Sequence, residues 1–113
     1  MRLFHLIAAS EWSAVQAAGA DYAPPSLAAE GFVHFSFADQ VAGTANRYYR
    51  AVPDLIVLEV DPDRLGSPVQ VEDSTGSGMA FPHVYAAIPL GSVVAVHPIT
   101  GSSGEDYVFS PDA

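Results

Sequence analysis

The sequence predicts a single domain of the α+β class, in which two short helices lie near the N-terminus and strands follow. Its 113 residues match the length of one domain, and half of them are hydrophobic, enough to form a buried core. Helical patterns end near residue 50, whereas strand patterns recur up to residue 96. This order differs from the strand–helix alternation of a doubly wound fold. We expect one domain over residues 1–113, with its core at about residues 2–99 and a polar tail over residues 101–113.

The first part of the chain predicts a strand, a helix and a connecting loop. Residues 3–8 form a buried strand that is apolar on both faces except at His5. Ser10 is a favourable N-cap for a short helix over residues 11–18. A pair of prolines predicts a loop or a single turn within residues 21–31.

A second strand and a second helix follow. Residues 32–37 alternate with period 2, so Phe32, His34 and Ser36 share one face and Val33, Phe35 and Phe37 share the other. Asp39 begins a helix that runs to about Arg50. Its inward stripe consists of Val41, Ala45, Tyr48 and Tyr49.

The second half of the chain predicts strands separated by turns. These strands cover residues 55–60, 68–72, 81–88 and 93–96, with a possible last strand at residues 107–109. The segment at residues 73–80 is rich in glycine and serine, and its composition predicts a mobile loop.

Charge and composition exclude several partners. The net charge is −9, there is no lysine, and the four arginines are Arg2, Arg47, Arg50 and Arg64. Nucleic-acid binding depends on basic side chains, so neither a nucleic acid nor an anionic membrane is an expected partner. A small anionic ligand held by one or two arginines is compatible with this charge. The chain has no cysteine, secretory signal or membrane-length apolar run, which predicts a cytoplasmic protein.

Three histidines occupy mid-strand positions and are the best candidates for a functional site. They are His5, His34 and His83, and Tyr85 shares the face of His83. A buried imidazole needs a hydrogen-bond partner or a wet cleft, so each could be an ordinary core histidine. Their number in so small a domain favours one shared cleft. His97, at a strand end, is expected to be an ordinary surface residue.

Other chemistries have less support in the sequence. No histidine pair has the spacing of a metal site, so no metal is expected. Ser36 could be a nucleophile backed by a histidine and an acid, either Glu59 or Glu72, but no G-x-S-x-G motif surrounds it. A role for Ser36 as a hydrogen-bond donor to a ligand fits better. Arg47 could hold a phosphate or carboxylate or belong to a solvated helix end, while Glu30 is expected to be a solvated loop acid.

Five segments give the chain a family resemblance. They are LFHLIAASEW, PPSLAAEGFVHFS, ANRYYR, DLIVLEVDPDRLG and FPHVYAAIPLGSVVAV. In this order they closely resemble the bacterial domain of unknown function 952 family, over nearly the whole chain up to about Ile99. The most specific piece is GFVHFS followed by a helix containing ANR, with FPHVY downstream.

That family resembles a compact relative of the ADP-ribosyltransferase fold, which includes NAD-dependent RNA 2′-phosphotransferases. The resemblance implies two small, roughly perpendicular, mainly antiparallel sheets with the ligand in the cleft between them. It also implies that His5 holds NAD and that Ser36, with His34 beside it, occupies the second-strand position. His83 stands nearest the usual catalytic glutamate, and a histidine there cannot supply a fixed negative charge.

Two functions follow as expectations. The first is a domain that binds a nucleotide or similar small ligand in a histidine-lined cleft, without turnover. The alternative is an NAD-dependent ADP-ribosyl or phosphoryl-acceptor transferase or hydrolase that uses His5, His34, Ser36 and His83. In both, His34 and His83 supply acid–base contacts. The ligand-binding residues are His5, Ser36, Arg47 and Tyr85.

Overall fold

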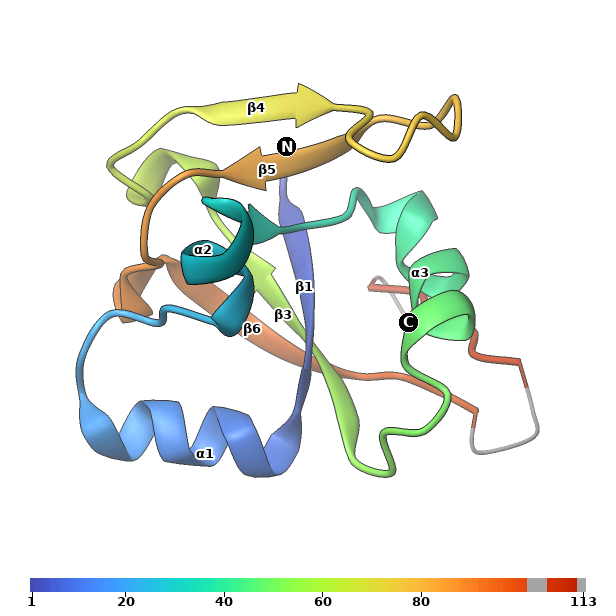
Figure 1. Ribbon diagram of the computed structural model, residues 1–113. Coiled ribbons are helices and arrows are strands. Elements are labelled where there is room, and N and C mark those ends of the chain that lie inside the picture. Colours follow the sequence, from blue (N-terminus) through green and yellow to red (C-terminus); the bar gives the residue numbers. More distant parts are fainter. Residues whose placement is uncertain (102–105, 112–113) are drawn as a thin grey trace.

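The protein consists of two small antiparallel sheets and short helices, as seen in a computed structural model that describes residues 1–101 and 106–111 (Figure 1). The first sheet has the strand order β1–β3–β6 and the second β2–β5–β4. The strands are β1 (Leu3–Ala8), β2 (Val33–His34), β3 (Leu55–Val60), β4 (Val69–Glu72), β5 (Phe81–Val84) and β6 (Val93–Pro98). The predicted α+β class and the two antiparallel sheets are confirmed. In Figure 1 the strands of the two sheets run in clearly different directions.

The two sheets are joined where the chain leaves β2. Backbone hydrogen bonds link Phe4 of β1 to Ser36 in both directions, at 2.9 and 2.7 Å. The segment predicted as one strand over residues 32–37 therefore pairs with strands of both sheets. Its first half pairs with β5, and its end pairs with β1.

Three α-helices lie between residues 9 and 48: α1 (Ala9–Ala18), α2 (Pro25–Glu30) and α3 (Val41–Tyr48). A short 3-10 turn, Ala38–Gln40, precedes α3, and two more, Pro62–Arg64 and Leu90–Ser92, lie in the second half of the chain. The prediction of only two helices is therefore wrong. None of the helices in the described ranges is long and apolar enough to span a membrane.

The helix α2 forms where a loop or single turn was expected. Pro25 occupies the first turn, where its missing N–H is no loss and its fixed φ suits a helix. Gly31 ends α2 with a φ of 89°, a left-handed conformation that glycine adopts without strain. As a result, β2 begins shortly after the end of α2.

Other predicted boundaries also shift. Ser10 does not cap α1; its backbone N–H instead donates to the Asp54 carboxylate at 2.8 Å. The helix α3 ends at Tyr48, and this tyrosine is 66% exposed rather than inward-facing. The strand predicted over residues 81–88 ends at Val84. In place of a strand at residues 107–109 there is one bridge, between Thr100 and Val108.

Apolar clusters pack on both faces of the first sheet. One fills the space between the two sheets and includes Leu3, Ile7, Trp12, Tyr22, Val33, Phe35, Leu58 and Val84. The other lies under α3 and includes Phe4, Leu6, Val41, Ala45, Val57 and Tyr107. The Asn46 side chain holds Tyr107 through both its backbone N–H (2.6 Å) and its C=O (3.2 Å). Part of the chain beyond residue 101 thus belongs to the core, and residues 102–105 and 112–113 of the expected tail lie outside the described residues.

Candidate functional site

The outer face of the second sheet carries a cluster of aromatic and polar side chains. His34 of β2 stands directly opposite His83 of β5, and their ring centroids lie 5.3 Å apart. Phe32 stacks on the His83 ring at a centroid distance of 4.0 Å. Their neighbours Val33 and Val84 point the other way, into the cluster between the sheets. We call the set Phe32, His34, Glu72, His83 and Tyr85 the histidine face.

His83 is held by a carboxylate from the adjacent strand β4. Its Nδ1–H donates to Oε1 of Glu72 at 2.9 Å, and the side chain is only 2% exposed. The other ring nitrogen, Nε2, has no hydrogen-bond partner among the described residues. A histidine whose Nδ1–H is fixed by a carboxylate keeps a lone pair on Nε2 and can act as a base.

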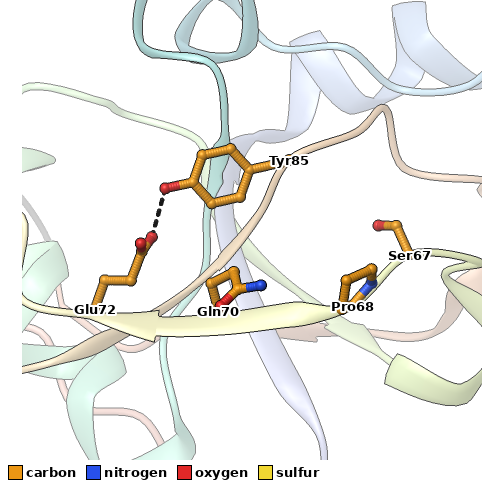
Figure 2. Close-up of a pocket in the computed structure, with 5 residues that line it drawn as sticks. All are labelled: Ser67, Pro68, Gln70, Glu72 and Tyr85. Atoms are coloured by element: carbon orange, nitrogen blue, oxygen red, sulfur yellow. Dashed lines mark hydrogen bonds between the residues drawn. The ribbon is translucent and has the colours of Figure 1, made fainter.

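Glu72 also accepts a hydrogen bond from the Tyr85 hydroxyl, at 2.6 Å (Figure 2). This bond, followed by the one from His83, lowers the pKa of Glu72 below its ordinary value. The same bond raises the pKa of Tyr85. Glu72 therefore stays ionised at neutral pH and supplies a fixed negative charge beside His83.

His34 differs from His83 in exposure and in partner. Its side chain is 46% exposed, and its Nε2 lies 2.8 Å from Oε2 of Glu30 at the end of α2. Glu30 is solvated as expected, with its side chain 51% exposed, but it ends α2 rather than lying in a loop, and it pairs with a histidine. The two histidines of the face are thus each held by a different carboxylate.

His5 lies inside the domain and not on the histidine face. Its Nδ1 is 2.6 Å from the His34 carbonyl oxygen, and its Nε2 is 2.9 Å from the Tyr22 hydroxyl. Burial lowers the pKa of His5 to about 4, so the ring is neutral at pH 7. The space between the sheets is packed with apolar side chains, so the single cleft that the sequence predicted for His5, His34, Ser36 and His83 does not form there.

Ser36 is also placed apart from the two paired histidines. It is 4% exposed, and its Oγ lies 3.4 Å from Oγ1 of Thr44 in α3. Neither acid considered for it is a partner, because Glu72 bonds to His83 and Glu59 bonds to His97 at 2.7 Å. His97 is consequently a partly buried, paired residue rather than an ordinary surface one.

The remaining predicted residues lie at the surface. Tyr85 is 49% exposed and belongs to the histidine face. Arg47 is exposed in the last turn of α3 and has no ion-pair partner among the described residues. Within residues 1–101 and 106–111, no three potential metal-ligating side chains cluster together.

A cavity of about 320 Å³ adjoins the histidine face. It is lined by Ser67, Pro68, Gln70, Glu72 and Tyr85 (Figure 2). Figure 2 shows Pro68, Gln70 and Glu72 along β4 and the segment before it, with the Tyr85 ring on the other side of the space. Its volume falls within the range of small-molecule sites.

Fold and site together define a small α+β domain with two histidines on one sheet, each hydrogen-bonded to a carboxylate.

The family described as "Protein of unknown function (DUF952)" matches residues 6–96, and the chain belongs to it. The chain is similar to protein CC0527 of Caulobacter crescentus, whose crystal structure is 27% identical in sequence. That match has a TM-score of 0.79 and covers 96% of this chain and 94% of the other. The solution structure of CC0527 gives a TM-score of 0.77 at 27% identity, covering 93% of this chain and 90% of the other. No curated protein matches the chain.

Proposed function

We propose that the histidine face binds a small ligand of the nucleotide class. The observation that carries the proposal is the position of the two histidines. The ring centroids of His34 and His83 lie 5.3 Å apart, and each ring is hydrogen-bonded to a different glutamate. Hydrogen-bonding side chains held in fixed positions beside exposed aromatic surface are typical of ligand sites. The partly exposed Tyr85 ring offers a stacking surface for a base, and Glu72 offers an acceptor for a ribose hydroxyl.

The charge of the ligand limits how it can be held. The histidine face contains the carboxylate of Glu72, has the carboxylate of Glu30 beside it and contains no arginine, so it suits the base and ribose better than the phosphates. Arg47 is an exposed guanidinium without an ion-pair partner among the described residues, but its helix α3 packs on the first sheet and it is not part of the histidine face. The net charge of −9 opposes binding of RNA or DNA, which the proposal excludes.

NAD-dependent transfer or hydrolysis is the second candidate, and one observation favours it. In the ADP-ribosyltransferase fold that the chain resembles, a catalytic glutamate stands where this chain has His83, and a histidine cannot supply the fixed negative charge of that glutamate. Glu72 of β4 lies 2.9 Å from Nδ1 of His83 and supplies the missing negative charge from the neighbouring strand. A carboxylate here would stabilise the positive charge that develops on a ribose when its bond to nicotinamide breaks.

Binding of NAD and adenosine, measured by isothermal titration calorimetry, tests the first proposal. We expect His34→Ala to weaken NAD binding about tenfold or more, since a hydrogen bond to a charged group carries about 1.5–3 kcal/mol and about 1.4 kcal/mol is a tenfold change in affinity. His97→Ala is the matched control, because His97 is also paired with a glutamate but lies in the first sheet. Equal affinities for both variants, or tighter binding of a single-stranded RNA than of NAD, would contradict the proposal.

Release of nicotinamide from NAD tests the second candidate. We expect Glu72→Gln to slow the release by about a hundredfold or more, because positioned acid–base and electrostatic groups contribute at least that much. Glu59→Gln, which alters the glutamate paired with His97, should leave the rate unchanged. If NAD binds to the wild-type protein but no nicotinamide appears, the domain is a binding module without this activity.

A further inference from the structure

The cavity beside β4 has a polar lining without any positive charge. Its five lining residues provide a carboxylate, an amide, a hydroxyl, an aromatic ring and a proline. Glu72 and Tyr85 are shared with the histidine face, and Ser67 lies at the other end of the row in Figure 2. Tyr85 is 49% exposed, so part of the residue is open to a second molecule.

One polar atom that borders this cavity, Oε2 of Glu72, has no partner within the described part of the chain. Both hydrogen bonds to Glu72, from His83 and from Tyr85, end on Oε1, which leaves Oε2 free to accept. The Ser67 Oγ is buried and makes no hydrogen bond. Because it is buried, this oxygen cannot contact a molecule in the cavity, so the free acceptor there is Oε2 of Glu72.

We propose that this cavity binds an organic cation, either a primary ammonium or a guanidinium group. Oε2 of Glu72 supplies the negative charge, and the Tyr85 ring supplies an electron-rich surface of the kind that attracts such cations. The side-chain amide oxygen of Gln70 accepts a hydrogen bond from a further N–H of the cation. The net charge of −9 raises the local concentration of cations around the whole chain.

The lining also distinguishes an organic cation from other ligands. An anion would face Glu72 with no opposing cation among the five lining residues. A metal ion requires several ligating groups, and no set of three occurs in the described ranges. The Tyr85 ring and Pro68 give the carbon atoms of an organic cation apolar surface to contact. The inference goes beyond nucleotide binding and does not depend on it. Because Glu72 and Tyr85 are shared with the histidine face, a nucleotide bound there would compete with the cation for these two residues.

Such a cation could belong to a free small amine or to an arginine or lysine side chain of another protein. Titrations followed by two-dimensional NMR separate these sources. One arm uses agmatine, and the other uses the capped peptide acetyl-Gly-Arg-Gly-amide. Tighter binding of agmatine indicates a free amine, and tighter binding of the peptide indicates a side chain. Methylguanidinium and its neutral analogue methylurea serve as the minimal probes, without NAD present.

We expect methylguanidinium to shift the amide signals of residues 67–72 saturably, and methylurea to leave them in place. Glu72→Gln should weaken binding about tenfold, and Tyr85→Leu should weaken it with Glu72 intact. Glu30→Gln is the matched control, because Glu30 also pairs with a histidine but does not line the cavity. Equal effects of methylguanidinium and methylurea, or equal affinities of Glu72→Gln and Glu30→Gln, would overturn the inference. So would the absence of shifts at tens of millimolar methylguanidinium with the wild-type fold intact.

Discussion

Phe35→Ala should lower the free energy of unfolding by about 3–5 kcal/mol, whereas His34→Ala should lower it by about 1 kcal/mol or less. Phe35 is 3% exposed and packs in the cluster between the two sheets, so its removal leaves a cavity. His34 is its neighbour on the chain but faces outward, and it loses only an exposed bond to Glu30. Denaturant unfolding of the two variants and the wild type measures both changes.

This pair of variants tests whether His34 belongs to the scaffold or to a site. For a domain near this size, about 1 kcal/mol shifts the melting midpoint by roughly 4–8 °C, so the difference is easily resolved. Similar losses for both variants would mean that His34 is a structural residue. In that event a loss of ligand binding in His34→Ala could no longer be assigned to a ligand contact.

Acidification should destabilise the fold through His5. Burial lowers the pKa of His5 from 6.5 to about 4. Between these two pH values the unfolded chain therefore binds a proton at His5 and the folded chain does not. The contribution of neutral His5 is therefore complete above about pH 6.5 and is lost as the pH falls towards 4. Between pH 7 and 5 this group alone should remove about 2 kcal/mol of stability.

His5→Gln provides the control for this pH effect. Glutamine does not titrate and can still bond to the Tyr22 hydroxyl, so the free energy of unfolding should change less between pH 7 and 5. Unfolding in urea at the two pH values measures the change in both proteins. If the wild type and His5→Gln lose the same free energy, His5 is not a buried neutral histidine.

Much of the fold was predictable because local patterns specified it. The apolar run of β1 and the alternation over residues 32–37 gave the strand positions and the inward side of Phe35. The helix α2 was missed because two adjacent prolines usually mark loops, although Pro25 at the first helical position is also a good start signal. The place of Tyr107 in the core was not predictable, because its backbone N–H is held by the side chain of Asn46, which is distant in the sequence.

The site was harder to predict because it depends on strand pairing. Nothing local indicates that His34 lies opposite His83, or that Glu72 reaches His83 from the neighbouring strand. The position of His5 inside the domain, away from the histidine face, was in part predictable. Strand alternation places it on the same face as Leu3 and Ile7, both of which belong to the cluster between the sheets.

The four histidines of the chain allow the central claim, a ligand site on the histidine face, to be tested in one measurement. Imidazole nitrogen signals can be followed by NMR during a titration with NAD. We expect the signals of His34 and His83 to shift together and to saturate. Those of His5, buried between the sheets, and His97, on the first sheet, should stay in place. Saturable shifts confined to His5 or His97, or no shifts at all, would contradict the claim.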